Sequence, residues 1–477
     1  MQFNSIVFFL FLGSSLIVYY LIPAKFRNYF LIAISALFYM YVKVEYIFII
    51  LFIIIANYLI GIQIEKTKNK RKRILYFNLS LLINLGILIF FKYWNFLMIN
   101  IFGLLGVFSL SSPTSLPILE IALPLGLSYY IFQTIGYITD IYRGSIKAEK
   151  NFSRLSLFTL FFPKLLVGPI ERANRLLPQF KKEISFEKEN IIEGGKRIIW
   201  GLFKKLVVAD RIAIYHSYVI ANSDVQSGSS IFFACILYTF QVYADFSGYT
   251  DIALGTARLF GFNLMENFKR PLLAKNISDF WRRWHISLSS WVNDYIFNPL
   301  SLKHRYWGNW GIFYALLISF IVIGIWHGAS WNYVLFGVLQ ALALIYETIT
   351  RKLRKNISKR INPVIYNNLS IIITFLFVTF SLIIFQSATL SEAMNIIRRI
   401  FSYHGSFFYN NPSTLLFMLI GCGIMMLYDI EEEYKIFRIH LFSNNNWIVQ
   451  QTSYALLLIF ILLAGVFDGG QFIYFAF

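Results

Sequence analysis

The sequence has few charged residues for its length. Of its 477 residues, 14% are Asp, Glu, Lys or Arg, whereas soluble domains carry about 25%. Hydrophobic residues make up 57% of the chain, and the mean hydropathy is +0.61. A soluble fold of this size would have to expose too much of that apolar surface to water. The shortage of charge therefore excludes an ordinary soluble protein and favours an integral membrane protein, whose solvent is lipid.

Cysteine is nearly absent as well. The chain has only Cys235 and Cys422, and each lies in an apolar stretch. Two isolated cysteines form neither a disulfide framework nor a zinc-binding pattern. We interpret both as small packing residues, and we expect no metal site and no bound cofactor.

Acidic residues are the scarcer charge, since 24 Asp and Glu stand against 43 Lys and Arg, for a net charge of +19. In a soluble domain this excess would suggest nucleic-acid binding. Here the basic residues lie in short runs between apolar stretches, as at 66–73 and 351–360. Such runs are typical of cytoplasmic loops that face anionic lipid head groups. We therefore expect membrane lipid as a partner and no nucleic acid.

Apolar stretches recur along the whole chain, from residues 6–21 to residues 452–467. Several are shorter than the roughly 20 residues that a straight helix needs to cross the hydrocarbon core. Some must therefore be re-entrant or broken. We predict an all-α, polytopic membrane protein with about 10–12 transmembrane helices plus re-entrant and interfacial helices. A single membrane domain is expected over residues 1–477.

Ionisable residues inside apolar sequence are candidates for function, because burying them in a membrane is costly. One of them is His327, in the sequence GIWHGASW that begins at Gly324. The two glycines of this sequence weaken a helix and allow a ligand to approach the backbone. His327 is either a catalytic residue or a core histidine that is bonded to the backbone. We expect Trp326 and Trp331 to pack around the site and to exclude water from it.

A second histidine, His285, lies in the sequence FWRRWHIS. Aromatic residues recur at helical spacing from Trp281 onward, which predicts one amphipathic helix at the membrane interface, with His285 on its polar stripe. Arg282 and Arg283 would bind lipid phosphates if this helix is only an anchor. They would bind the phosphates of a nucleotide-bearing donor if it belongs to an active site.

Three further ionisable residues lie within apolar sequence. Asp245 and Asp251 must be paired or hydrated there. We favour structural ion pairs with Arg258 or with the two arginines beside His285, and the alternative is that they orient a histidine. Lys164 lies in a proline-containing stretch that predicts a kinked or re-entrant segment. Its amine either snorkels to the interface or faces a polar tunnel.

The motifs occur in an order that resembles the membrane-bound O-acyltransferase family. They are VGPIERANRLLPQF from Val167, YADFSGYTDIALG from Tyr243, NFKRPLLAKNISDFWRRWHISLSSWVNDYIFNPL from Asn267, GIWHGASWNYVLFG from Gly324 and FIYFAF from Phe472. The similarity is to the bacterial branch that contains the membrane subunits for alginate and peptidoglycan O-acetylation and for teichoic acid D-alanylation. It extends over residues from about 120 to 477.

The resemblance implies a ring of helices around a central tunnel, with His327 as the catalytic base and His285 acting with it. It implies transfer of an acetyl group from a cytoplasmic donor, acetyl-CoA in preference to a carrier protein, to an extracytoplasmic hydroxyl. The acceptor would be an alginate-like exopolysaccharide or peptidoglycan. A separate esterase-like acetyltransferase would complete the delivery outside the bacterial inner (plasma) membrane.

The terminal motif carries a further expectation. By analogy with a small peptide of the teichoic acid system, Tyr474 would relay the acyl group, although Ala476 stands where relatives commonly have Gln. Two other classes of function remain open on the sequence. Many spans and buried charges also describe a multi-pass transporter, and a non-enzymatic membrane scaffold is the third possibility.

Overall fold

The computed structural model describes residues 1–107, 118, 119, 122–409, 411–436, 442, 444 and 446–467. Every regular element in this part of the chain is helical, so the all-α prediction is confirmed. The helices form two compact units. The first unit comprises Met1–Gly194, Thr256–Met265 and Gly328–Ser330, and the second comprises Gly195–Gly255, Glu266–His327 and Trp331–Phe477.

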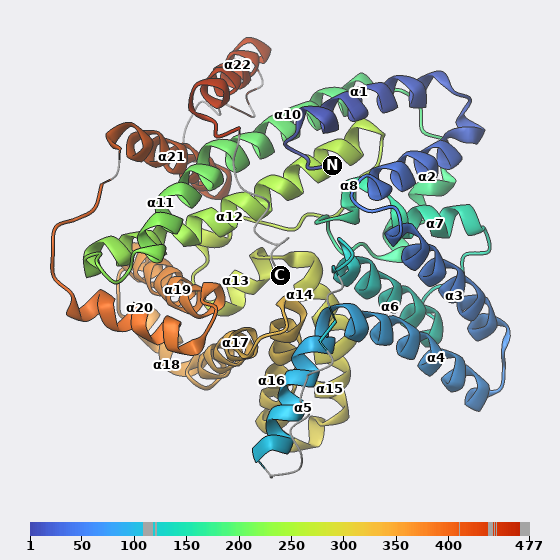
Figure 1. Ribbon diagram of the computed structural model, residues 1–477, viewed down its shortest axis with the longest axis horizontal. Helices are drawn as coiled ribbons and strands as arrows, with labels where there is room; N and C mark the ends of the chain where they lie inside the picture. Colours follow the sequence, from blue (N-terminus) through green and yellow to red (C-terminus); the bar gives the residue numbers. More distant parts are fainter. Residues whose placement is uncertain are drawn as a thin grey trace. The chain divides into compact units, whose positions relative to one another are not determined.

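The first unit combines long apolar helices with short, broken ones. Its elements are α1 (Ile6–Leu21), α2 (Ala24–Met40), α3 (Tyr46–Lys66), α4 (Lys70–Leu88), the π-helix η1 (Ile89–Tyr93), α5 (Trp94–Val107), α6 (Leu127–Arg143), α7 (Phe152–Leu160), α8 (Phe162–Leu165), α9 (Ala173–Leu176) and the 3₁₀ turn η2 (Gln179–Lys181). Helices α3, α4 and α6 pack against one another (Figure 1). The predicted kink is confirmed, since α7 ends just before Pro163, which cannot continue a helical hydrogen-bond ladder.

A buried polar cluster joins α3 to α4. The Ser80 hydroxyl donates to Asn57 Oδ1 at 2.6 Å, and Asn84 Nδ2 donates to the same oxygen at 3.0 Å. All three side chains are buried. Within lipid, the hydrophobic effect does not drive apolar helices together, so hydrogen bonds of this kind help to hold them in contact.

The second unit contains most of the long helices. Its elements are α10 (Lys188–Leu202, which begins in the first unit), the π-helix η3 (Phe203–Ala209), α11 (Asp210–Ala221), α12 (Gly228–Leu259), η4 (Pro271–Leu273), α13 (Ile277–Arg283), α14 (Ile286–Val292), the π-helix η5 (Asn293–Phe297), α15 (Asn298–Lys303), η6 (Arg305–Trp307), α16 (Asn309–His327), α17 (Trp331–Ile349), α18 (Arg351–Ser358), α19 (Pro363–Gln386), α20 (Leu390–Ser402), α21 (Pro412–Tyr434) and α22 (Trp447–Ala464). Helices α16 and α17 lie side by side (Figure 1), and α17 also packs on α13 and α19.

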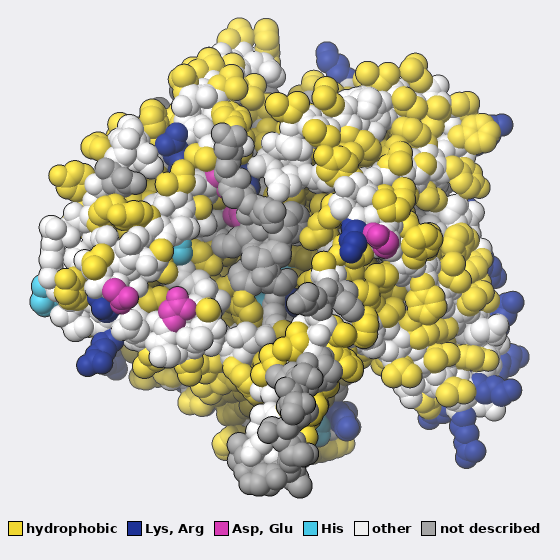
Figure 2. Space-filling model, in the orientation of Figure 1, with side chains coloured by type: hydrophobic (Ala, Val, Ile, Leu, Met, Phe, Trp, Pro, Cys, Tyr) yellow, Lys and Arg dark blue, Asp and Glu magenta, His cyan; other side chains and the backbone are white. Residues whose placement is uncertain are grey.

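Eight helices in the described residues are long and apolar enough to cross a membrane. They are α3, the continuous run Lys70–Gly106, α12, α16, α17, α19, α21 and α22, while α1 is a shorter apolar helix. Fewer helices qualify than predicted, because the apolar stretches 155–170 and 198–220 are divided among short helices and a π-helix. Hydrophobic side chains are spread over the visible surface in Figure 2, whereas charged side chains are sparse. The chain is thus a polytopic membrane protein.

Glycines allow α16 and α17 to pack closely. A Cβ at Gly324 would lie 2.2 Å from the carbonyl oxygen of Tyr333, and a Cβ at Gly337 would lie 2.2 Å from that of Phe320. Small residues let the backbones of membrane helices approach in this way. Gly324 was expected to admit a ligand to the backbone, but it lies against the neighbouring helix.

Gly324→Ala is expected to lower the free energy of unfolding by about 1–3 kcal/mol, because the added methyl group meets backbone that cannot rotate away. Thermal unfolding of the purified protein in detergent measures the effect. Gly423→Ala in α21 is the matched control, since a Cβ there meets nothing within 4 Å. The packing role would be refuted by equal stability losses in the two variants.

Candidate active site

Two histidines of the second unit share contact with one tryptophan. His285 connects α13 to α14 and is 0% exposed, and His327 ends α16 and is 4% exposed. The ring centroid of Trp326 lies 5.4 Å from that of His285 and 5.1 Å from that of His327. The fold therefore brings together three residues that the sequence had placed in two separate motifs.

The backbone turns sharply at His285. Its φ of 43° and ψ of 53° are left-handed, a conformation that costs a non-glycine residue about 1–2 kcal/mol. Trp284 N still donates to Phe280 O at 2.8 Å, but Ile286 N donates to Asn267 O at 2.9 Å. The prediction of one continuous amphipathic helix is therefore wrong. In a continuous helix, Ile286 N would donate to a carbonyl oxygen of the preceding turn, and here the backbone oxygen of Asn267 takes the place of that acceptor. His285 is buried and does not lie on a polar stripe.

Aromatic rings enclose both imidazoles. The Phe246 ring lies 4.8 Å from that of His285, and the Phe385 ring lies 5.1 Å from that of His327. Trp331 does not share this role, because it is 63% exposed. Burial lowers the pKa of His285 well below its ordinary value. His285 is thus neutral near pH 7, the form in which an imidazole can accept a proton.

A small cavity adjoins His327. Its volume is about 20 Å³, which is enough for one water molecule. Most of its lining is aromatic or aliphatic, and Gln340 supplies a polar side chain. Gln340 accepts a hydrogen bond from Trp281 Nε1 at 3.1 Å and donates one to Ser381 Oγ at 3.0 Å. His327 therefore faces a nearly dry space that has a few fixed hydrogen-bonding groups.

The two aspartates of α12, Asp245 buried and Asp251 half-buried, form ion pairs with adjacent lysines of η3. Lys205 Nζ lies 2.9 Å from Asp245 Oδ1 and 2.8 Å from Asp210 Oδ1, while Lys204 pairs with Asp251. Ion pairing was the favoured interpretation of both aspartates, but the partners found are the lysines of η3 and, for Asp251, also Arg197; they are not the arginines that were predicted. Sequence reasoning passed over these lysines, although two adjacent charges inside an apolar stretch were a usable signal.

The two arginines before His285 differ in their surroundings. The Arg282 side chain is 69% exposed and lies 3.8 Å from Asp279. Arg283 donates to Asp279 Oδ1 at 3.0 Å and to Glu433 Oε1 at 2.9 Å. Arg282 is thus accessible to a phosphate, whereas Arg283 is engaged by two carboxylates. A donor-binding role for either residue stays a prediction.

Two other predicted site residues belong elsewhere. Lys164 lies in the first unit, where its buried amine donates to Gln133 Oε1 at 2.6 Å and to Thr159 O at 3.4 Å. Snorkelling is therefore wrong for this side chain, and a tunnel-lining role remains a prediction. Tyr474 lies outside the described residues.

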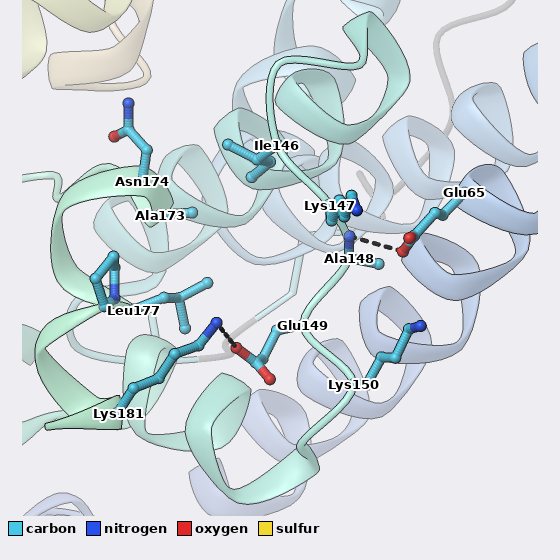
Figure 3. Close-up of a pocket in the computed structure, with 11 residues that line it drawn as sticks. Glu65, Ile146, Lys147, Ala148, Glu149, Lys150, Ala173, Asn174, Leu177 and Lys181 are labelled. Carbon is cyan, nitrogen blue, oxygen red and sulfur yellow. Dashed lines mark hydrogen bonds and ion pairs between the residues drawn. The ribbon is translucent and has the colours of Figure 1, made fainter.

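The first unit has a larger pocket of about 480 Å³ (Figure 3). It is lined by Glu65, Ile146, Lys147, Ala148, Glu149, Lys150, Ala173, Asn174, Leu177, Pro178 and Lys181. Figure 3 shows that its acidic side chains are engaged: Glu65 accepts from Ala148 N at 2.9 Å, and Glu149 pairs with Lys181 at 3.5 Å. None of the predicted site residues lines this pocket, so we place the candidate active site at the two histidines.

In this helical membrane protein, two buried imidazoles lie against one indole ring in a nearly dry setting, where a neutral imidazole can accept a proton. The model of the membrane-bound O-acyltransferase family matches residues 149–389, which include both histidines. The chain belongs to this family. Family membership favours the enzyme over the transporter and the scaffold.

Three relatives show which branch of the family the chain resembles. It is 33% identical over 408 residues to a probable alginate O-acetylase of Pseudomonas putida, with 84% of this chain and 81% of the relative covered. It is 30% identical over 447 residues to a peptidoglycan O-acetyltransferase of Helicobacter pylori, with 84% and 81% covered. It is 31% identical over 288 residues to a teichoic acid D-alanyltransferase of Bacillus subtilis, with 55% and 68% covered.

Proposed function

We propose that this enzyme moves an acetyl group from cytoplasmic acetyl-CoA to a hydroxyl of an extracytoplasmic polysaccharide, at the inner membrane of a bacterium. The observation that carries the proposal is the buried contact of His285 and His327 with Trp326, in a chain that belongs to an acyltransferase family. The names of two relatives, an alginate O-acetylase and a peptidoglycan O-acetyltransferase, support acetyl as the group and a polysaccharide as the acceptor.

The chemistry that we assign to His327 is general base catalysis. Its neutral imidazole takes the proton of the attacking hydroxyl, whose oxygen then bonds to the thioester carbonyl carbon. The carbon–sulfur bond breaks, and the leaving thiolate takes the proton from the imidazolium. We assign His285, which contacts the same Trp326 ring, to orienting the reacting groups. The aromatic rings around both histidines exclude water and so limit hydrolysis of the thioester.

The delivery outside the membrane needs a second protein in this proposal. A separate esterase-like acetyltransferase receives the acetyl group and passes it to an alginate-like exopolysaccharide or to peptidoglycan. Residues 1–477 act as one membrane domain. The proposed relay on Tyr474 would connect the site to that partner, and its support is the similarity of the terminal motif alone.

The most direct test of the proposal is to identify the acyl donor. Membranes that contain the protein, a candidate partner and either polymer are supplied with labelled acetyl-CoA or with a labelled acetyl carrier protein. Label is expected in the polymer with acetyl-CoA. If label reaches the polymer only from the carrier protein, the donor in the proposal is wrong and the enzyme class stands. Folded protein that turns over neither donor would refute the proposed function.

A further inference from the structure

A buried asparagine holds the turn that carries His285. Asn267 is 0% exposed. Its Oδ1 accepts hydrogen bonds from the backbone N of Ser287 at 3.1 Å and from the Ser287 hydroxyl at 2.8 Å. Its backbone oxygen accepts from Ile286 N at 2.9 Å. All three bonds therefore fall on the two residues that directly follow His285.

The same segment is also fastened on the other side of His285. Lys269 N donates to Arg283 O at 2.9 Å. Arg270 Nε and Arg283 Nη2 donate to the two oxygens of one carboxylate, that of Glu433, at 2.7 and 2.9 Å. Residues 267–270 thus hold the chain in place both before and after His285 through hydrogen bonds and a shared carboxylate. A left-handed non-glycine residue persists only where its surroundings hold it in this way.

We propose that Asn267 is a positioning residue for acyl transfer. It fixes the backbone at Ser287 and thereby directs the imidazole of His285 against Trp326, and it acts on the reaction only through His285. The inference rests on the proposed function, since it concerns the same two histidines. A displacement of about 1 Å in a reacting group can lower a rate on the order of 100-fold.

Asn267→Ala removes the two side-chain hydrogen bonds to Ser287. We expect kcat for acyl transfer to fall by about 10- to 100-fold, while the KM for the donor changes by less than about threefold. Asn84→Ala is the matched control, because Asn84 is a buried, hydrogen-bonded asparagine of the first unit. Its loss should reduce the amount of folded protein and leave kcat per folded molecule unchanged. The proposal would be overturned if Asn267→Ala, like this control, lowered only the amount of folded protein and left kcat per folded molecule unchanged.

Ser287→Ala tests the same contact more gently. It removes the hydroxyl donor and keeps the backbone N–H bond to Asn267 Oδ1, so the turn should still form. We expect kcat to fall by about two- to fivefold, the size of effect that one neutral hydrogen bond can have. This variant keeps the test decisive if Asn267→Ala does not fold.

A double-mutant cycle with His285→Ala separates positioning from other roles. If Asn267 acts through His285, then adding Asn267→Ala, or Ser287→Ala, to His285→Ala produces no further loss of kcat. Losses that multiply would show that Asn267 acts elsewhere and would overturn the inference. Full activity of His285→Ala would also overturn it and would remove the role assigned to His285, while acetyl transfer by the enzyme would stand. Absence of transfer in the unmodified protein would be a failure of the proposed function itself.

Discussion

Replacing His327 with alanine should reduce acyl transfer per folded molecule by about 100- to 10,000-fold, the range over which a general base contributes. The imidazole is buried at the end of α16 and borders a small cavity, and the proposed function assigns it the removal of the proton from the acceptor hydroxyl. Transfer of labelled acetyl in membranes measures the loss, normalised to the amount of folded protein.

The control for this experiment is another buried histidine. His216 of α11 lies in the same unit and stacks on Tyr238 with the ring centroids 4.5 Å apart. His216→Ala should lower stability but keep most of the transfer per folded molecule. Similar losses in both variants would mean that a buried imidazole matters here only for packing. Retained transfer in His327→Ala would show that another residue is the catalytic base.

The largest effect on stability is expected for Lys205→Met. Its ammonium group lies within 2.9 Å of both Asp210 and Asp245, and all three side chains are buried. Without it, two carboxylates would face each other in a medium that solvates them poorly. Breaking a buried ion pair in this way costs about 3–5 kcal/mol. Thermal unfolding in detergent, compared with the unmodified protein, provides the measurement.

The neighbouring lysine is the control for this prediction. Lys204→Met should cost less, because Asp251 keeps Arg197, whose Nη2 lies 3.0 Å away. Neutralising both carboxylates together with Lys205, as in Lys205→Met with Asp210→Asn and Asp245→Asn, should recover part of the stability, because no buried charge is then left alone. A loss of less than about 1 kcal/mol in Lys205→Met would show that the pair is hydrated and exposed.

The sequence predicted the features that depend on composition and on local residue type. A polytopic helical fold followed from the lack of charge, and the kink near Pro163 followed from the proline in that stretch. The contact of His285 with Trp326 could not be derived from spacing, since it joins the turn after α13 to the end of α16. The resemblance to a family suggested that both histidines act together, and the fold supplied their shared neighbour.

The sequence could not reveal the turn at His285. Read alone, the residues around it fit a helix, because their aromatic side chains recur at helical spacing. The break depends on hydrogen bonds that Ile286 and Ser287 donate to Asn267, which lies in a different segment of the chain. Nor could a helical pattern identify the partners of Asp245 and Asp251, because η3 places two successive lysines where both can reach α12.

The π-helix η3 has a consequence for how this stretch of sequence is aligned. A π-helical turn inside a helix contains one residue more than the α-helical turn that it replaces. The side chains of α10 and α11, which precede and follow η3, are therefore out of phase with one another. A related chain that lacks the extra residue would still form both helices. Its alignment with this sequence would show a gap within 203–209. That gap would mark a lost lysine contact and not a shortened loop.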